Sequence, residues 1–505
     1  MLVVGAGPTG LVLALWLARL GVRVRIIDRT EAPGTTSRAL AVQARTLEFE
    51  RQVGLSDAVV AQGVPLIAVN LWVAGRKVAR VEFGAMGVRL SPFPYALITP
   101  QDAHERVLIA GLDAAGISVE RKTTLRGFED LGDRVRARVA RPDGREEEVE
   151  VAYLAGCDGA SSDVREALGI GFPGGTYEHL FYVADVDASG PVINGELNGA
   201  LDEADFLAIF PLRGEGRARI VGTIRAEAAA RHTALSWDDI GKDVIARLGL
   251  QILRVNWFST YHVHHRVADR FGRGRVFLAG DAAHIHSPVG GQGMNTGIGD
   301  AVNLAWKLAN VVRGHAETAL LETYEPERIA FARRLVATTD RVFTGITRRG
   351  PLARRVRLRV VPVVLPALFR LPAVRRFMFR TISQTVITYR GQRLSAGRAG
   401  RVHGGDRLPW VSLGEGHDNF AALASLAWQV HVYGEASTTL RETCRARGIA
   451  LHAFTWRRTM RRPGLLRNAF YLVRPDGYVA LASTDRAGTA LASYLDARGL
   501  RAARD

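Results

Sequence analysis

The fold is decided by the stretch MLVVGAGPTGLVLALWLARLGVRVRIIDR, which spans Met1–Arg29. It joins a short β-branched run, a glycine turn, a helix of apolar periodicity and a second strand. Gly5, Gly7 and Gly10 have the spacing of a turn that lets the backbone approach phosphate, and Asp28 stands where an acid binds a ribose hydroxyl. The pyrophosphate would lie on the first amides of the helix. The stretch therefore predicts a Rossmann-like α/β domain that binds a dinucleotide.

Two arginines follow the second strand. Arg38 and Arg45 lie in TTSRALAVQARTLEF, where a helix is expected from Ala41. Guanidinium groups bind phosphates and planar acceptors through paired hydrogen bonds. We therefore expect one of the two arginines to contact a phosphate or a flavin edge, with a solvated surface position as the alternative.

Length and composition describe a large globular protein. The chain of 505 residues is 47% hydrophobic and 23% charged, which predicts roughly two to four domains. Its two cysteines, Cys157 and Cys444, are too few for a disulfide framework or a cysteine-rich metal site, so a reducing cytoplasm is expected. The net charge of +17 comes mostly from arginines spread along the chain without base-reading modules. We therefore expect no nucleic-acid binding.

The densest basic region runs from Arg348 to Arg380 around the apolar segment VVPVVLPALF, Val360–Phe369. That segment has about half of the roughly 20 apolar residues that a transmembrane helix needs, and it contains two prolines. A solvated helical pair packed on the body of the protein is the first expectation. Peripheral contact with an anionic membrane surface is the alternative.

Two further glycine-rich stretches occur later in the chain. Tyr153–Ile170, YLAGCDGASSDVREALGI, runs from an apolar strand end into a helix that Ser161, Ser162 and Asp163 can cap. Ala279–Ala309, AGDAAHIHSPVGGQGMNTGIGDAVNLAWKLA, places an acid, two histidines and a glycine bend before a long helix. Glycines there allow positive φ angles and a close approach of the backbone to something flat or charged.

The histidines of the chain do not predict a metal site. His284 and His286 are two residues apart without an evident third ligand nearby, while HVHH, His262–His265, alternates as a strand does. We interpret these histidines as polar pocket or packing residues.

Three motifs together carry a family resemblance. GAGPTG, GCDGASSDVR and RVFLAGDAAHIHSPVGGQGMNTGIGDAVNLAWKLA occur in the order and approximate spacing of the flavin-dependent aromatic hydroxylases. The chain thus resembles the single-component monooxygenases such as para-hydroxybenzoate hydroxylase and phenol hydroxylase, over about residues 1–390 and more weakly to the end. The resemblance implies FAD as cofactor. Matched one by one to the family motifs, the residues implied to contact it are Gly5, Gly7, Gly10, Asp28, Arg38, Gln101, Asp158, Asp281, Pro288, Gly291, Gly293, Met294 and Asn295.

The third motif would face the flavin. The resemblance implies that Asp281 hydrogen-bonds the ribityl chain and that Pro288 and the turn Gly291–Asn295 lie along the isoalloxazine. Elementary electrostatics supports the second assignment independently. A helix beginning near Asn295 or Thr296 would direct unpaired amides and a positive dipole at the negative charge of reduced flavin.

The resemblance also implies a reaction cycle. The sequence has no second dinucleotide fingerprint, so NADPH or NADH is expected to bind transiently. In the family it reduces the flavin, and O2 then forms a C4a-hydroperoxide that transfers one oxygen atom to an aromatic ring. The expected function is hydroxylation of a phenolic or polycyclic aromatic substrate. Rivals are Baeyer–Villiger oxidation, epoxidation or oxidative substituent removal on the same scaffold, or a flavin-containing binding protein without turnover.

A mixed sheet would supply the catalytic and substrate residues. GGTYEHLFYVADVDA alternates as a strand from Phe181 onward. Because a base that deprotonates a phenol raises ring reactivity, Tyr177, His179 and Tyr182 are candidates for a proton role, with pocket lining or packing as the alternative. The candidates for apolar pocket walls are Trp72, Phe206, Phe210 and Pro211.

The expected fold class is α/β with three domains. A non-contiguous FAD-binding domain would comprise residues 1–69, 101–175 and 271–390, and a mixed-sheet substrate domain residues 70–100 and 176–270. A glycine-rich linker, Tyr389–Trp410, is expected before a thioredoxin-like domain of residues 391–505. That domain lacks a C-x-x-C pair, because Cys444 is its one cysteine, so it is expected to pack or to help association, for instance in a homodimer.

Overall fold

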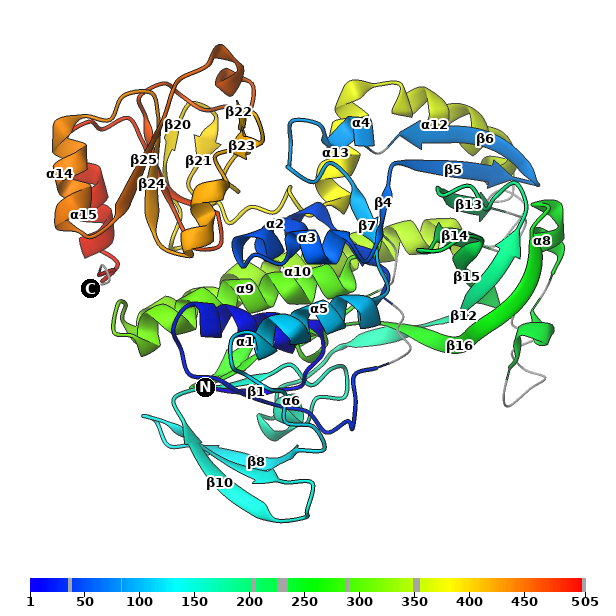
Figure 1. Ribbon diagram of the computed structural model, residues 1–505, viewed down its shortest axis with the longest axis horizontal. Helices are drawn as coiled ribbons and strands as arrows, with labels where there is room; N and C mark the ends of the chain where they lie inside the picture. The colour runs from blue at the N-terminus through cyan, green and yellow to red at the C-terminus, as the bar shows by residue number, and fades with distance from the viewer. Residues whose placement is uncertain are drawn as a thin grey trace.

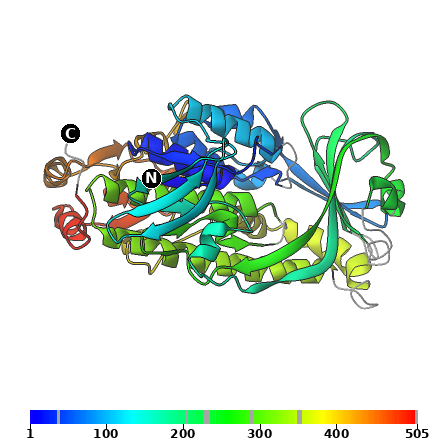
Figure 2. The same ribbon diagram turned by 90° about the horizontal axis from the view of Figure 1, so that it is seen from below.

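The computed structural model describes residues 1–34, 39–82, 84–201, 206–224, 235–240, 242–286, 290–347 and 355–501. A nucleotide-binding-type α/β unit lies between a large curved sheet and a C-terminal unit (Figure 1). Turned by 90°, the molecule shows the large sheet and the C-terminal unit at opposite ends (Figure 2).

A five-stranded sheet forms the centre of the α/β unit, in the order β17-β18-β11-β1-β2. β1 pairs in parallel with both β2 and β11, and β11 pairs in parallel with β18, so distant chain segments build one sheet. Its strands are β1 Leu2–Val4, β2 Arg25–Ile27, β11 Leu154–Gly156, β17 Gly272–Arg273 and β18 Val276–Leu278.

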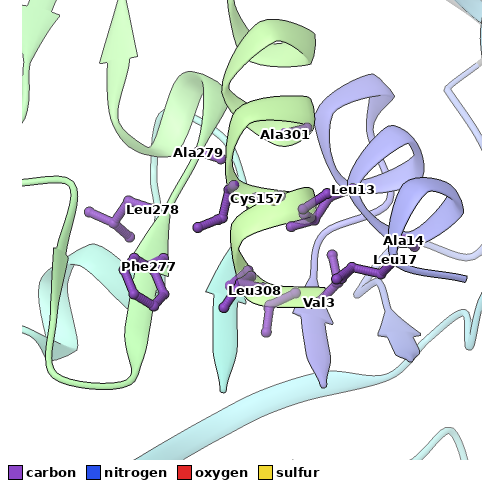
Figure 3. Packing of buried hydrophobic residues seen from close by; sticks show 14 of the residues in the cluster. Val3, Leu13, Ala14, Leu17, Cys157, Phe277, Leu278, Ala279, Ala301 and Leu308 are labelled. Carbon is purple, nitrogen blue, oxygen red and sulfur yellow. The ribbon is translucent and has the colours of Figure 1, made fainter. Parts of the chain in front are cut away.

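Helix α1, Pro8–Arg19, is buried along most of its length. Every residue from Gly10 to Leu17 is buried, because the run GLVLALWL has no polar face to turn to water. Leu13 and Leu17 share one apolar cluster with residues of β1, β18 and α9, Gly293–Val312 (Figure 3). The sequence motifs of Met1–Arg29 and Ala279–Ala309 therefore fold against each other.

Smaller elements surround this core. Two three-stranded sheets contain β3 Ala41–Val42, β7 Ala96–Ile98 and β4 Val64–Leu66, and β8 Thr124–Asp130, β9 Val135–Ala140 and β10 Glu146–Val151. The accompanying helices are α2 Ala44–Gln52, α3 Ser56–Val60, α4 Gly84–Gly87, α5 Gln101–Asp113 and α6 Asp163–Ala167.

The second unit is an eight-stranded sheet in the order β19-β16-β12-β15-β14-β13-β5-β6. It is mixed, because β13 pairs in parallel with β5 while the other neighbours are antiparallel. Its strands are β5 Ala68–Val73, β6 Arg76–Glu82, β12 Gly174–Ser189, β13 Leu197–Leu201, β14 Phe206–Pro211, β15 Arg217–Ile224, β16 Gln251–Val267 and β19 His284–Ile285. Helix α8, Asp243–Arg247, covers one face of the sheet.

A helical region follows α9. α10, Tyr324–Thr347, runs on from a 3₁₀ turn at Thr318–Thr323, and a π-helical turn at Val356–Val360 leads into α12, Val361–Phe369, and α13, Pro372–Ile382. Among the described residues, none of the helices is both long and apolar enough to cross a bilayer.

The C-terminal unit contains a six-stranded sheet in the order β21-β20-β27-β26-β24-β25. Its strands are β20 Ala396–Ala399, β21 Val402–His403, β24 Gln429–Tyr433, β25 Ala450–Phe454, β26 Phe470–Val473 and β27 Val479–Ser483, and its helices are α14 Thr438–Ala446 and α15 Thr489–Asp496. A two-stranded ribbon adds β22 Ser412–Gly414 and β23 His417–Asp418. The hairpin expected at Pro475-Asp476-Gly477 is present, with Gly477 at φ +73°.

The expectation of a linker at Tyr389–Trp410 is wrong. Two strands of the C-terminal sheet, β20 and β21, lie within this stretch, and Ala399, Val402 and Leu408 are buried. The glycines misled the prediction: Gly400 and Gly405 take positive φ angles in tight turns between packed strands rather than in a loose connection.

Candidate functional site

The glycine turn after β1 is tight at its ends and open in the middle. A Cβ atom at Gly5 would lie 2.3 Å from the Cys157 carbonyl oxygen, and one at Gly10 would lie 1.9 Å from the Gly5 carbonyl oxygen. A Cβ atom at Gly7 would meet nothing within 4 Å. The fold itself therefore requires Gly5 and Gly10, whereas at Gly7, beside the first turn of α1, the space is free for a ligand.

Asp28 stands at the end of β2 and orders the same turn. One carboxylate oxygen accepts a hydrogen bond from the Ala6 amide at 2.6 Å, and the other accepts from the amide and hydroxyl of Thr30 at 2.8 and 2.6 Å. The oxygen that accepts from Ala6 retains a lone pair for a ligand hydroxyl. The position fits the ribose-binding role that the sequence predicts.

The first and third motifs meet at Thr9. A Cβ atom at Gly280 would lie 2.5 Å from the Thr9 hydroxyl oxygen, and one at Gly297 would lie 2.4 Å from the same atom. Gly280 also has φ +65°. The glycines of the third motif thus let α1, the Asp281 turn and α9 pack within contact of one another.

Asp281 follows Gly280, and its carboxyl has no hydrogen-bond or ion-pair partner among the residues that the structure describes. The carboxyl is exposed, so a ligand can reach it, while the burial of its surroundings raises its pKa above the ordinary aspartate value. A partnerless carboxyl in dense surroundings suits a hydroxyl-bearing ligand such as a ribityl chain.

A buried group of charged residues binds the backbone of the Asp281 turn through the Gly280 amide. Asp300 on α9 accepts hydrogen bonds from the Gly280 amide at 3.1 Å and from Arg328 Nε at 2.6 Å, and its other contact is His284 Nε2 at 2.6 Å. The Arg328 guanidinium and His284 keep the pKa of Asp300 below its usual value despite its burial. His284 is therefore a packing and pairing residue, and no group of three potential metal ligands occurs among the described residues.

Helix α9 starts at Gly293, two residues before the expected start at Asn295. Asn295 lies inside the helix and does not cap it, because its side chain hydrogen-bonds to the turn before the helix and to the chain near Gln43. Its oxygen accepts from the Gln43 amide at 2.8 Å and the Thr46 hydroxyl at 2.7 Å, and its nitrogen donates to the carbonyls of Ala41 and Gly291, both at 2.8 Å. The first amides of α9 lack intrahelical partners and remain the groups that can face a ligand.

Two other predicted cofactor residues have partners inside the protein. Asp158 caps α6, accepting from the Ser162 hydroxyl at 2.6 Å and the Val164 amide at 3.1 Å. Gln101, at the start of α5, donates to Glu105 at 2.7 Å. Arg38 and Pro288 lie outside the described residues.

Arg45 does not lie where a phosphate or flavin contact would need it. Its guanidinium is buried and donates to Glu48 at 2.8 Å and to the Asp476 carbonyl of the C-terminal unit at 2.6 Å. It also stacks over the rings of Phe49 and Tyr478. That expectation is wrong for Arg45, which instead joins the α/β unit to the C-terminal unit.

The large sheet separates its predicted residues onto two faces. Tyr182 packs with Trp237, Phe258 and α8 on one face, and Trp72 lies against the same cluster while donating to Asn198 at 2.9 Å. Pro211 is buried and pairs in register with Ala218 of that cluster.

Tyr177 and Phe210 lie away from the α8 cluster. Tyr177 contacts His265, with 4.7 Å between ring centroids, and packs beside Phe181. Phe210 packs against a cluster with Ala41, whose Cβ lies 2.8 Å from the position of a Cβ on Gly291. Through this cluster, Phe210 of the sheet is connected to the turn before α9. The side chains of His179 and Phe206 are outside the described part of the chain.

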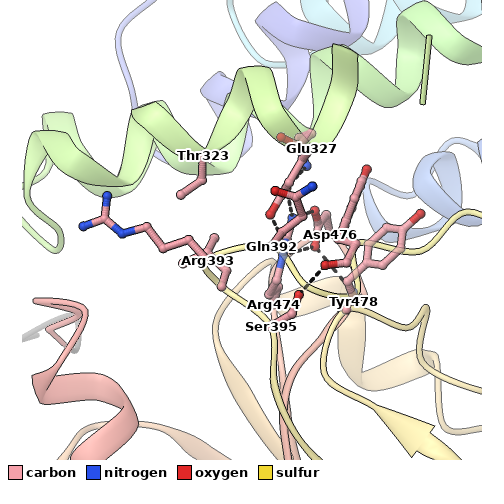
Figure 4. Close-up of polar contacts among 12 residues, drawn as sticks. Thr323, Glu327, Gln392, Arg393, Ser395, Arg474, Asp476 and Tyr478 are labelled. Carbon is pink, nitrogen blue, oxygen red and sulfur yellow. Dashed lines mark hydrogen bonds and ion pairs between the residues drawn. The ribbon is translucent and has the colours of Figure 1, made fainter. Parts of the chain in front are cut away.

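Sequence reasoning missed a buried charged group between α9, α10 and the C-terminal hairpin. Glu327 accepts from Lys307 Nζ at 2.9 Å. It also accepts from both terminal nitrogens of Arg474 at 2.8 and 3.0 Å, and Arg474 donates to Asp476 at 2.6 Å (Figure 4). All four side chains are buried. Glu327 precedes Arg328, so one turn of α10 connects the C-terminal unit to the Asp281 turn. The sequence ETYEPER contains Glu327 and Arg328, but charged residues in a helical pattern usually indicate a helix face exposed to solvent. Their burial was therefore not predicted.

Comparison with known proteins agrees with this geometry. Residues 1–339 match the family described as FAD binding domain. The chain is 40% identical to 6-methylpretetramide 4-monooxygenase of Streptomyces rimosus over 375 residues, which are 72% of this chain and 66% of that relative, just under two thirds of its length. It is 30% identical to a flavin-dependent monooxygenase of Mycobacteroides abscessus over 512 residues, 98% of this chain and 99% of that protein.

A solved structure extends the match to the whole chain. OxyS, the anhydrotetracycline hydroxylase from Streptomyces rimosus, has a TM-score of 0.78 and 29% identity, with 99% of both chains covered. The chain belongs to the FAD-binding-domain family of FAD-dependent aromatic monooxygenases.

Proposed function

We propose that this enzyme uses NAD(P)H and O2 to hydroxylate a phenolic or polycyclic aromatic substrate at an FAD site. The observation that carries the proposal is the meeting of the motifs at Thr9. It brings the open Gly7, the partnerless Asp281 and the free amides of α9 into one part of the α/β unit.

These residues fit FAD without rearrangement of the core. Gly7 and the first turn of α1 would hold the pyrophosphate, Asp28 the ribose and Asp281 the ribityl hydroxyls. Gly291 and Gly293 would let the backbone reach the ring system. When bound, FAD supplies the hydride acceptor and the oxygen activation that side chains cannot provide.

The protein itself would supply position and electrostatics. The α9 amides would stabilise negative charge on the ring, since a helix start carries roughly half a positive charge. Arg328 and Asp300 fix the Gly280 amide, so the Asp281 carboxyl keeps its place without a partner of its own. Preorganised groups of this kind need no rearrangement during the reaction.

An aromatic substrate would bind between the α9 turn and the sheet face that carries Phe210 and Tyr177. A polycyclic substrate is the preferred class, because relatives named for 6-methylpretetramide and anhydrotetracycline share this architecture. Of the predicted proton-transfer residues, Tyr177 keeps a suitable position beside His265, whereas Tyr182 faces the α8 cluster.

We propose a thioredoxin-like fold for the C-terminal unit, with a role in packing. The order of its elements supports this fold. Parallel β24 and β25 are joined through α14, and the antiparallel pair β26 and β27 leads to α15. Its single cysteine, Cys444, is buried, and burial raises the pKa of its thiol to about 11. Dithiol chemistry is therefore not part of the proposal.

Product analysis under labelled oxygen tests the function. The purified holoenzyme is incubated with NADH or NADPH, ¹⁸O2 and a panel of phenols, aromatic acids and polycyclic quinones. We expect substrate-stimulated NAD(P)H oxidation and a product that gains one ¹⁸O atom on a ring carbon. An oxygen atom inserted between carbons would favour Baeyer–Villiger oxidation, and tight binding without NAD(P)H consumption would favour the binding-protein alternative.

A further inference from the structure

The segment Arg348–Arg380 has an extreme composition. It uses only arginine, glycine, proline, alanine, valine, leucine, phenylalanine and methionine, and ten of its residues are arginines. The nearest acids along the chain are Asp340 and Asp406. The side chains of this segment therefore offer a binding partner guanidinium groups and hydrocarbon alone.

In Arg355–Arg380, several of the side chains that the structure describes are apolar and exposed; we call this surface the α12–α13 face. Val364 and Leu368 on α12, with Val360 before it and Leu371 after it, are exposed and recur at helical spacing. Val363 is 69% exposed, Leu371 52% and Phe377 on α13 66%. Figure 1 shows α12 on the outer side of β6, the edge strand of the large sheet. Apolar side chains gathered on an exposed surface indicate a surface that binds a partner or a membrane.

Arginines lie among these apolar groups. Arg355, Arg359, Arg370 and Arg376 are exposed, and none of their side chains forms a hydrogen bond or an ion pair with any residue that the structure describes. At β9 and β10, by contrast, the partly exposed arginines Arg134 and Arg136 contact Glu150. The α12–α13 face therefore presents uncompensated positive charge beside exposed hydrocarbon.

The face is firmly attached to the body of the protein. Phe379 of α13 is 1% exposed and packs with Met86 and Phe93. At the end of α13, the Ile382 carbonyl accepts a hydrogen bond from Gln292 Nε2 at 2.8 Å. Gln292 is the residue before α9, so the inner side of this face is bonded to the turn of the cofactor site.

We propose that the α12–α13 face docks the enzyme on an anionic lipid bilayer. Anionic headgroups match the unpaired arginines, and the acyl boundary matches the exposed valines, leucines and Phe377. A second copy of the chain is disfavoured as occupant, because a symmetric contact would bring like-charged arginines together without an acid in the segment. This inference rests on the surface and not on the proposed reaction.

Vesicle flotation of the FAD-loaded full chain tests the docking. One vesicle contains phosphatidylcholine alone, and the other contains equal parts of phosphatidylcholine and phosphatidylglycerol. We expect flotation with the second vesicle only, and a decline of the bound fraction with added salt. The triple variant Arg355→Gln, Arg359→Gln, Arg376→Gln should lose about fivefold in partitioning for each arginine. The double variant Val363→Ser, Phe377→Ser should lose at least about tenfold at unchanged charge.

A matched control separates the face from net charge. Arg441→Gln, Arg445→Gln and Arg467→Gln remove three exposed charges from the C-terminal unit and should leave flotation unchanged. Equal losses in the two triple variants would overturn the proposal, and so would absence of binding to either vesicle. If polyglutamate displaces the chain while the Val363/Phe377 variant still floats like the parent, the face is a site for an acidic protein. A dimer in sedimentation that Leu371→Ser abolishes would assign the face to a second copy.

Discussion

Two groups of arginines in this molecule have the same charge but opposite surroundings, one buried and paired and the other exposed and unpaired. In the inner group, Arg328 and Arg474 are fully buried and each contacts a carboxylate. In the outer group, Arg355, Arg359 and Arg376 stand exposed on the α12–α13 face without a partner among the described residues. The net charge of +17 does not distinguish arginines that are paired in the interior from arginines that are unpaired at the surface. Arg474 of the inner group joins two units, whereas the arginines of the outer group remain available to bind something outside the chain.

The inner group also explains why the C-terminal unit is part of the enzyme. Arg474 and Asp476 come from the C-terminal hairpin, and Glu327 and Arg328 are neighbours on α10. Asp300 then connects Arg328 to the Gly280 amide. Two ion pairs, joined by the neighbouring residues Glu327 and Arg328, and one hydrogen bond thus connect the C-terminal hairpin to the residue before Asp281.

The largest expected effect comes from removing the charge of the inner group. Arg474→Met leaves Glu327 and Asp476 buried with fewer partners, which should destabilise the protein by about 3–5 kcal/mol. Urea unfolding of the holoenzyme measures the loss. Arg447→Met is the matched control, since its exposed contact with Asp496 should contribute less than about 1 kcal/mol. Equal effects of the two changes would contradict the distinction between the groups.

Acid should act on the same group in a defined window. Arg474 and Lys307 overcome the burial of Glu327 and lower its pKa from 4.5 to about 2. Because the folded pKa lies below the unfolded value, this stability, on the order of 3 kcal/mol, is present above pH 4.5 and disappears as the pH falls toward 2. Urea midpoints at stepped pH should show that Glu327→Gln removes this part of the decline. A Glu327→Gln curve parallel to the parent curve would exclude the assignment.

An uncharged contact provides a scale for the ionic ones. Gly297→Ala would place a Cβ 2.4 Å from the Thr9 hydroxyl oxygen and should destabilise the protein by about 1–3 kcal/mol through overpacking. Adding Thr9→Ala removes that oxygen and should restore part of the stability. The unfolding midpoint and the FAD content of both variants measure the effect, and an additive loss in the double variant would argue against the contact.

The smallest effect is expected on the outer group. The triple variant Arg355→Gln, Arg359→Gln, Arg376→Gln should change the free energy of unfolding by less than about 0.5 kcal/mol per site, because these side chains are exposed and form no hydrogen bond or ion pair with the described residues. Thermal unfolding in the absence of lipid checks this. A loss comparable to that of Arg474→Met would mean that the outer group also holds the fold together.

The sequence was informative where one segment alone determines a structure. Met1–Arg29 predicted its turn and helix because glycine spacing and apolar periodicity are local properties. The location of Arg45 could not be predicted, because it depends on Asp476 and Tyr478 in a unit that folds from the far end of the chain. The same applies to Tyr182, whose face of the sheet is set by register and by the cover of α8.

FAD affinity and stability of Gly7→Ala together test the cofactor site most directly. The Cβ of the new alanine would meet no protein atom within 4 Å, so the unfolding midpoint of the cofactor-free protein should stay unchanged. A pyrophosphate lying on this turn would meet that Cβ, so the dissociation constant of FAD should rise by at least about tenfold, an order-of-magnitude expectation for lost close approach of the backbone. An unchanged FAD dissociation constant in a stable variant would contradict the proposed site.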